Sequence, residues 1–162
     1  MPTRTTNQLH FEDLAPDRFE EMISSIVFRM RKWQSINHFG KNGADSGVDI
    51  RGVEELESGK VRIFNFQCKR YKKINQSQIK HILDDYVKQN EDASSANYIL
   101  VVACAVSRKN VEKFEQYAES KGILIASIWD KTYIESLLYY SFPDLLFVYF
   151  NLDLSSDRHK RV

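Results

Sequence analysis

The sequence predicts an α/β domain in which a central mixed β-sheet is flanked by α-helices, and three observations support this prediction. A turn signal at residues 57–60 separates two segments with strand character, as in an antiparallel hairpin. Residues 98–106 are almost all apolar, which is typical of a central strand covered on both faces. After the hairpin, helical and strand patterns alternate, which predicts right-handed crossover units and a partly parallel sheet.

The composition predicts a single cytoplasmic domain without a membrane partner. A chain of 162 residues fits one domain over residues 1–154, followed by a polar tail or the start of a linker at 155–162. Its apolar runs are much shorter than the roughly 20 residues that span a bilayer. Two cysteines in apolar strands, and an N-terminus without a signal-peptide pattern, favour a reduced, cytoplasmic setting. Because the net charge is only +1, any surface for nucleic acid must be local.

The first helix is predicted from Pro16 to about Met30. Proline suits the first turn of a helix, and apolar residues then recur at helical spacing, namely Phe19, Met22, Ile23, Ile26, Val27 and Met30. On a helical wheel of about 100° per residue, Glu20 borders this stripe and Glu21 points to solvent. Glu20 is therefore the carboxylate that could approach a site at the edge of the core. The alternative is that Glu20 is a surface residue beside the stripe.

The segment 61–70 is predicted to be a strand whose two faces differ at its end. Successive side chains of a strand point to opposite faces. One face stays apolar and carries Phe64, Phe66 and Cys68. The other face becomes polar and carries Asn65, Gln67 and Lys69. If the chain reverses at Ser58 or Gly59, Asp49 lies opposite Gln67 or Lys69. A carboxylate, an amide oxygen and an ammonium group would then meet on one face.

These three groups suit the hydrolysis of a phosphodiester. Mg²⁺ or Mn²⁺ prefers hard oxygen ligands, which Asp49 and Gln67 can supply. A bound metal acidifies water and polarises the phosphate, and Lys69 can offset the charge that develops on the phosphorus. The alternative is a buried strand end with a surface lysine and an aspartate in a turn.

Residues next to this hairpin are candidates for supporting roles. Arg70, Lys72 and Lys73 form a basic run that suits contacts with a phosphate backbone, although such a short run is usually a solvated loop. Asp45, in the glycine-rich turn, is expected to cap backbone amides or to support a metal from further away. Gln78 is a weaker candidate near the start of the next helix.

The later elements alternate between helix and strand. They are a helix at 77–89 that begins at Ser77, a strand at 98–106, a helix that begins at Ser107 and ends at Gly122, a strand at 123–129, and a short helix capped by Asp130. The apolar segment 145–152 is predicted to be either a last helix on the core or a dimer surface.

The order of these motifs resembles a known family of nucleases. A helix with Glu20, then Gly-x-Asp-x-Gly-x-Asp at residues 43–49, then Gln-Cys-Lys-Arg-Tyr at residues 67–71, is similar to the Mrr-type catalytic domain of the PD-(D/E)xK superfamily. The resemblance covers roughly residues 9–140. It implies a restriction-endonuclease-like core, in the branch where glutamine replaces the usual second acidic residue.

The resemblance also implies a role for each site residue. Asp49 would be the main metal ligand, and Gln67 would take the place of the second acidic ligand. Lys69 would be the catalytic lysine, Glu20 the acid of the first helix that completes the metal site, and Asp45 an acidic turn position common in this branch.

We therefore expect a metal-dependent DNA endonuclease that cuts double-stranded DNA with Mg²⁺ or Mn²⁺ and little sequence preference. It would act in restriction of foreign DNA, or as the effector domain of a larger defence protein fused to a sensor or recognition domain. A homodimer or higher oligomer is expected, because a double-strand break needs two sites. The alternatives are a structure-selective nuclease of the Holliday-junction type, and a catalytically silent nucleic-acid-binding module on the same fold.

Overall fold

A five-stranded mixed sheet forms the centre of the protein, seen in a computed structural model that describes residues 9–39 and 47–154. The strands are β1 (Ser35–His38), β2 (Ile50–Glu55), β3 (Val61–Lys69), β4 (Asn97–Val102) and β5 (Ile125–Trp129). They lie side by side in chain order. The pairs β1–β2 and β2–β3 are antiparallel, whereas β3–β4 and β4–β5 are parallel. The predicted mixed sheet is confirmed.

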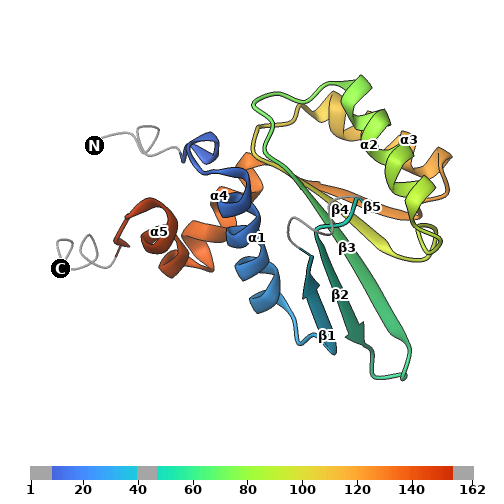
Figure 1. The fold of residues 1–162 in the computed structure, drawn as a ribbon, viewed down its shortest axis with the longest axis horizontal. Helices are drawn as coiled ribbons and strands as arrows, with labels where there is room; N and C mark the ends of the chain where they lie inside the picture. The colour runs from blue at the N-terminus through green and yellow to red at the C-terminus, as the bar shows by residue number, and fades with distance from the viewer. Residues whose placement is uncertain (1–8, 40–46, 155–162) are drawn as a thin grey trace.

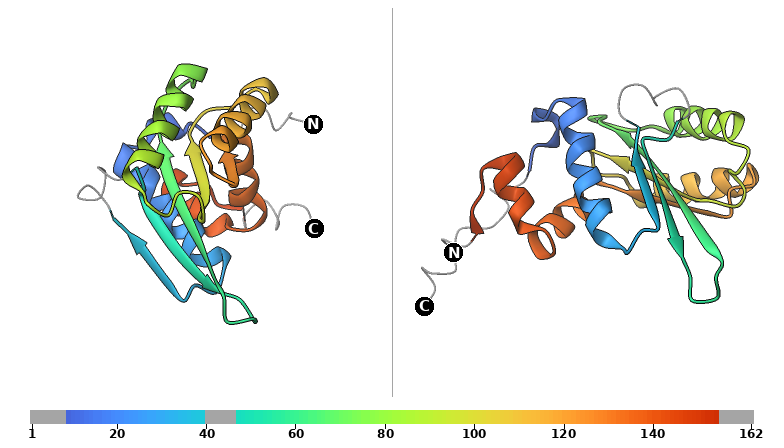
Figure 2. Two further views of the ribbon diagram at one scale, coloured as in Figure 1. Left: turned by 90° about the vertical axis from the view of Figure 1, so that its right-hand side faces the viewer. Right: turned by 60° about the horizontal axis from the view of Figure 1, so that its bottom comes forward.

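Helices cover both faces of this sheet (Figures 1 and 2). In the described ranges they are α1 (Pro16–Met30), α2 (Gln76–Gln89), α3 (Arg108–Ser120), α4 (Lys131–Tyr140) and α5 (Pro143–Phe150), with a short 3₁₀ turn, η2 (Phe11–Asp13), before α1. α1, α4 and α5 share one hydrophobic core with one face of the sheet, and α2 and α3 share a second core with the other. This arrangement is consistent with a restriction-endonuclease-like α/β core.

The first helix has the bounds that its sequence predicts. α1 begins at Pro16 and ends at Met30. Its buried residues are Phe19, Met22, Ile23, Ile26 and Val27. This apolar stripe lies on the core and fixes which way the other side chains of α1 point.

Helix starts depend on single polar side chains, and one of the three predicted starts was wrong. Ser107 and Asp130 cap α3 and α4, as predicted. For α2, however, the cap is Asn75 rather than Ser77, and Gln78 completes a reciprocal capping box. Asn75 is the cap because its side-chain oxygen accepts from the backbone N–H of Gln78.

The strands β4 and β5 are both shorter than the apolar segments 98–106 and 123–129 that predict them, β4 at its C-terminal end and β5 at its N-terminal end. β5 begins at Ile125 because residues before it complete the end of α3. Gly122 has φ of +85°, and the backbone N–H of Ile123 donates to the carbonyl of Ala118. β4 ends at Val102, beyond which the chain turns toward α3.

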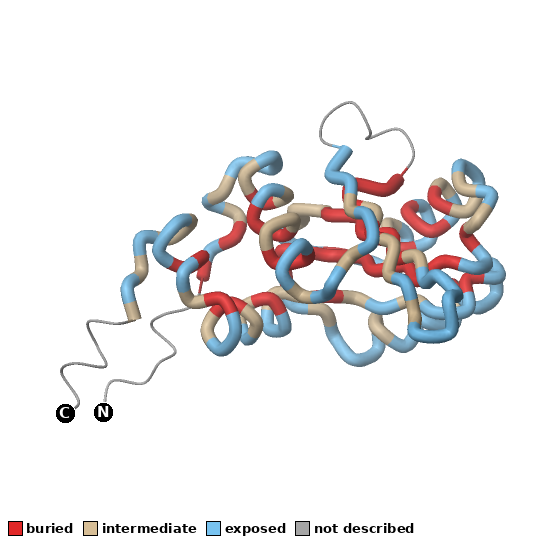
Figure 3. Tube along the Cα trace, turned by 90° about the horizontal axis from the view of Figure 1, so that it is seen from below, coloured by how far each residue is buried: buried red, intermediate tan, exposed pale blue. Residues whose placement is uncertain are grey.

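Burial follows the layers closely (Figure 3). All six residues of β4 are buried, as predicted for a central strand. β5 is an edge strand, and Ile125 in it is 61% exposed. α5 packs on the core through Leu145 and Leu146 but leaves Phe147 and Val148 exposed, so the predicted last helix is confirmed. Among the described helices, none has both the length and the apolar character that a bilayer crossing requires.

Candidate active site

The hairpin formed by β2 and β3 sets the geometry of the candidate site. Ile50 pairs with Phe66, and Glu55 pairs with Val61. The backbone N–H of Asp49 donates to the carbonyl of Phe66 at 2.8 Å, so Asp49 and Ile50 both lie beside Phe66 at the end of the hairpin. Extended by one residue, the register with its reversal centred at Ser58 gives Gln67, one of the two expected partners of Asp49, but the backbone N–H of Asp49 bonds one residue earlier, to Phe66.

Asp49 is a buried carboxylate that is held by the backbone of the facing strand. It is 8% exposed, and its Oδ2 accepts a hydrogen bond from the backbone N–H of Cys68 at 2.6 Å. Burial raises the pKa of Asp49, although the Cys68 hydrogen bond and the charge of Lys69 act in the opposite direction. A carboxylate offers about four lone-pair positions, so this single hydrogen bond leaves capacity for a cation.

Gln67 is buried beside Asp49, and its amide is held by a tyrosine. It is 7% exposed, and the hydroxyl of Tyr98 on β4 donates to its Oε1 at 2.6 Å. Burial raises the pKa of Tyr98 well above its usual range, so the hydroxyl keeps its proton as a donor. A carbonyl oxygen has two lone pairs, and the second lone pair of Oε1 can still coordinate a metal.

Lys69 lies at the end of β3, two residues after Gln67 on the same strand face. It is partly exposed. The charge of Lys69 lowers the pKa of Asp49. Because the Asp49 carboxylate accepts from Cys68, it lies at the same end of the sheet as Gln67 and Lys69.

Glu20 reaches this end of the sheet from α1. Burial raises the pKa of Glu20, and the nearby charge of Asp49 raises it further. Glu21 is more exposed and pairs with Arg18 at 3.0 Å. The two neighbours thus differ as the helical wheel predicts, because only Glu20 interacts with Asp49.

His38 is part of this cluster, although sequence reasoning did not include it. Its Nε2 lies 3.4 Å from Oε2 of Glu20, and its charge lowers the pKa of Asp49. The histidine is positioned by the pairing of His38 with Ile50 between β1 and β2. The sequence pattern does not mark it, because the pairing of residues 35–38 with residues 50–53 joins strands that are separated in the chain.

The basic run after β3 divides into two parts. Arg70 donates from Nη1 to the backbone carbonyl of Glu12, so its guanidinium group joins β3 to η2. Lys72 and Lys73 are exposed. The run therefore offers two exposed lysine side chains, whereas Arg70 has a structural contact within the fold.

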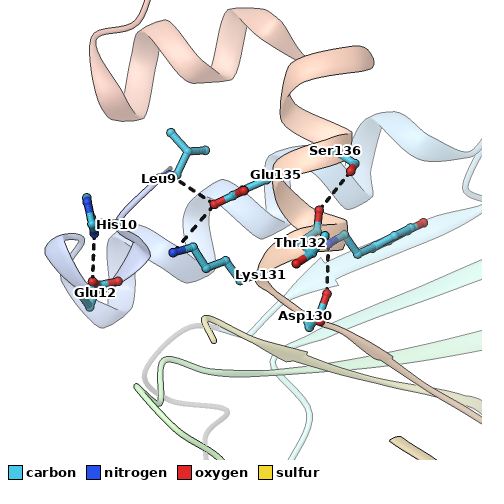
Figure 4. A network of polar contacts seen from close by, with 9 residues as sticks. Leu9, His10, Glu12, Asp130, Lys131, Thr132, Glu135 and Ser136 are labelled. Atoms are coloured by element: carbon cyan, nitrogen blue, oxygen red, sulfur yellow. Dashed lines mark hydrogen bonds and ion pairs between the residues drawn. The ribbon is translucent and has the colours of Figure 1, made fainter. Parts of the chain in front are cut away.

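The segment that Arg70 contacts is itself fixed to α4 (Figure 4). Glu135 accepts from the backbone N–H of Leu9 at 3.2 Å and lies 4.0 Å from Nζ of Lys131. His10 and Glu12 also pair, at 3.2 Å. These contacts hold residues 9–13 across the end of the sheet, close to the end of β3.

The two remaining supporting candidates are Gln78 and Asp45. The Oε1 atom of Gln78 accepts from the backbone N–H of Asn75 at 2.9 Å, which gives Gln78 a structural role in α2. Asp45 lies outside the described residues, so its predicted role stays a prediction.

The donor set suits a hard divalent cation. Asp49 and Glu20 are carboxylates whose pKa values are both raised by burial, and Gln67 adds an amide oxygen. In the described part of the chain, no group of three or more His, Cys, Asp or Glu side chains is arranged to hold a metal. A site here would therefore depend on the neutral oxygen of Gln67 for its third ligand.

Comparisons with known proteins found no protein family, no curated protein and no solved structure that matches this chain.

Proposed function

We propose that the chain is a metal-dependent DNA endonuclease domain that hydrolyses phosphodiester bonds. The observation that carries this proposal is the register of β2 and β3. It brings Asp49 to the end of β3, where the backbone N–H of Cys68 donates to the Asp49 carboxylate, and Gln67 is the residue between Phe66 and Cys68. Lys69 follows on the same face. These are a carboxylate, an amide oxygen and an ammonium group at one end of a sheet, which is the combination that phosphoryl chemistry needs.

The residues present fit Mg²⁺ or Mn²⁺. Asp49 and Gln67 would hold the cation, and Glu20 would complete its coordination, because all three offer the oxygen ligands that these ions prefer. When bound, the cation would acidify a water molecule and neutralise charge on the scissile phosphate. A cation would also reduce the repulsion between Asp49 and Glu20, which now raises the pKa of Glu20.

The protein side chains would divide the remaining work. Lys69 would place a positive charge where the phosphate gains negative charge in the transition state. The backbone N–H of Cys68 holds Oδ2 of Asp49, so that carboxylate is oriented before substrate binds. Glu20 and His38 would orient each other through their contact at 3.4 Å.

DNA would be held mainly through its phosphates. Lys72 and Lys73 are exposed immediately after β3 and are the candidates for backbone contacts. Contacts of this kind carry no sequence information, so we propose little intrinsic sequence preference. Restriction of foreign DNA, or an effector role in a larger defence protein, is the setting that suits such an activity.

The decisive experiment is digestion of plasmid DNA by the purified chain. We expect nicked and linear products with Mg²⁺ or Mn²⁺, and none with EDTA. Lys69→Ala should abolish cleavage and keep the fold, which circular dichroism can check. Cleavage that persists in EDTA would overturn the proposal. Retained DNA binding without cleavage would favour the silent binding module, and a strong preference for four-way junctions would favour the structure-selective nuclease.

A further inference from the structure

Tyr98 contributes the hydroxyl group that contacts the candidate ligand Gln67 from inside the protein. Its hydroxyl donates to Oε1 of Gln67 at 2.6 Å, and the tyrosine side chain has no exposed surface. Gln67 lies on β3 and Tyr98 on β4, and these two strands are parallel neighbours. The contact therefore comes from the protein interior and not from the side on which substrate would bind.

Neighbouring rings hold the hydroxyl of Tyr98 in place. The ring of Tyr98 packs against that of Tyr86 at a tilt of 33° with centroids 4.2 Å apart, and it stacks on Phe114 with a centroid distance of 6.4 Å. A Cβ atom added to Gly47 would lie 3.8 Å from both Oε1 and Nε2 of Gln67. The amide of Gln67 thus lies against the backbone of Gly47 as well as the phenol of Tyr98.

The direction of this hydrogen bond matters because the two ends of an amide differ. Oε1 can coordinate a cation, whereas the Nε2 end presents two N–H donors that repel one. If the amide were rotated, Nε2 could donate to the Tyr98 oxygen, but the buried hydroxyl proton would lose its acceptor. A buried donor without an acceptor is costly, so Tyr98 favours the orientation with Oε1 toward itself.

We propose that Tyr98 is the positioning residue that holds the Gln67 amide in one orientation, so that the second lone pair of Oε1 is the one available to a cation. This inference rests on the proposed function, because it names the residue that makes a neutral amide a dependable ligand. A glutamate in the same position would not need this help, since both of its terminal atoms are oxygens.

The test is a double-mutant comparison of Tyr98→Phe in two backgrounds, measured by Mn²⁺ binding and by plasmid cleavage. In the natural chain, Tyr98→Phe should lower Mn²⁺ affinity about tenfold or more, as is typical for residues that orient a metal ligand. In the Gln67→Glu background, the same substitution should have a much smaller effect. Equal losses in the two backgrounds, or no loss in the natural chain, would overturn the inference.

A matched control is Tyr86→Phe, which removes the adjacent buried hydroxyl. That hydroxyl accepts from Asn65 Nδ2 at 2.9 Å. Tyr86→Phe should therefore lower thermal stability and leave Mn²⁺ affinity unchanged. If it lowers Mn²⁺ affinity as much as Tyr98→Phe does, the effect is general loosening of this core and the inference fails.

A measurement on the unaltered chain covers the case in which a variant does not fold. During an NMR titration with Mg²⁺, the side-chain amide of Gln67 and the backbone amide of Cys68 should shift with the same saturation curve. The first reports on Gln67, and the second reports on Asp49 through its hydrogen bond. A shift at Cys68 alone would reject Tyr98 as a positioning residue while keeping the metal site. No shift at either group would reject the proposed function itself.

Discussion

At the scale of single residues, Asp49 is a carboxyl group that is buried. Its charge therefore has a measurable effect on the free energy of unfolding, separate from its proposed role as a metal ligand. The folded-state pKa of Asp49 is raised above its unfolded value, so the folded chain binds the proton more tightly. The favourable contribution of this carboxyl group is therefore present below the unfolded pKa and is lost as pH rises through the raised folded pKa. At neutral pH the ionised carboxylate weakens the metal-free fold.

The first prediction follows for Asp49→Asn. Asparagine keeps an oxygen acceptor for the Cys68 N–H but carries no charge. In EDTA, urea denaturation should give a higher free energy of unfolding for the variant at pH 8, and the difference should shrink toward about pH 4. Cleavage with Mg²⁺ should fall roughly 100-fold or more, since metal-based stabilisation is worth several kcal/mol. A variant less stable than the natural chain at pH 8 would contradict this account of Asp49.

The second prediction compares the two neighbouring glutamates of α1. Glu20→Ala should lower the cleavage rate about 10- to 100-fold, which is the range for residues that support a metal site. Glu21→Ala should leave the rate within about twofold, because exposed surface pairs contribute little. Initial rates of plasmid nicking at fixed Mg²⁺ measure both effects. Similar rates for the two variants would show that the contact between Glu20 and Asp49 has no part in the chemistry.

At the scale of secondary-structure elements, α2 is defined by its cap. The third prediction is that Asn75→Ala lowers the free energy of unfolding by about 1 kcal/mol. The loss arises because Asn75 accepts from Gln78, which in turn accepts from the backbone of Asn75. Ser77 lies two residues further along the chain, and Ser77→Ala should change the free energy of unfolding by less than about 0.5 kcal/mol. Urea denaturation of both variants tests this, and a larger loss for Ser77→Ala would restore serine as the cap.

The elements show which parts of the fold are readable from sequence. α1 could be predicted to the residue, because a proline at the first turn and a regular apolar stripe both depend on local chemistry. The strand ends were harder. The apolar run at 123–129 begins directly after the end of α3, but β5 starts only at Ile125. The hydrogen bond from the backbone N–H of Ile123 to the carbonyl of Ala118 assigns Ile123 to the end of α3.

The same division holds within the candidate site. Counting from the turn predicted that Asp49 meets the end of β3, and its carboxylate accepts there from the backbone N–H of Cys68. His38 and Tyr98 were not predicted, because each reaches the site through pairing between strands that are separate in the sequence. Tyr98 in particular lies in a continuous apolar run, where nothing in the pattern marks its hydroxyl as different.

At the scale of the whole molecule, the net charge of +1 makes the location of each lysine more important than the total. The fourth prediction is that replacing both Lys72 and Lys73 with alanine weakens DNA binding about equally for different sequences. The slope of log K for binding against log salt concentration should also become less steep by roughly two, or about one for each lost phosphate contact. Fluorescence anisotropy with labelled duplexes at several salt concentrations measures both effects.

A control with the same change in charge separates location from total charge. Lys60 lies in the turn between β2 and β3, at the opposite end of β3 from Lys69, and Lys88 lies in the last turn of α2. Replacing both with alanine should change the affinity and its salt dependence much less. An equal effect from the two double variants would show that binding follows overall charge and not the surface next to the site.

The strand β3 pairs with its two neighbours in different ways, and this has a consequence for how a newly made chain matures. Its pairing with β2 closes a tight reversal and needs little loss of chain entropy. Its pairing with β4 must wait until all of α2 has folded back, and such distant contacts form slowly. A nascent chain that ends soon after β3 could form this hairpin, but it would lack the phenol of β4 that donates to Gln67. We therefore expect the proposed cleavage activity to appear only after β4 has paired with β3.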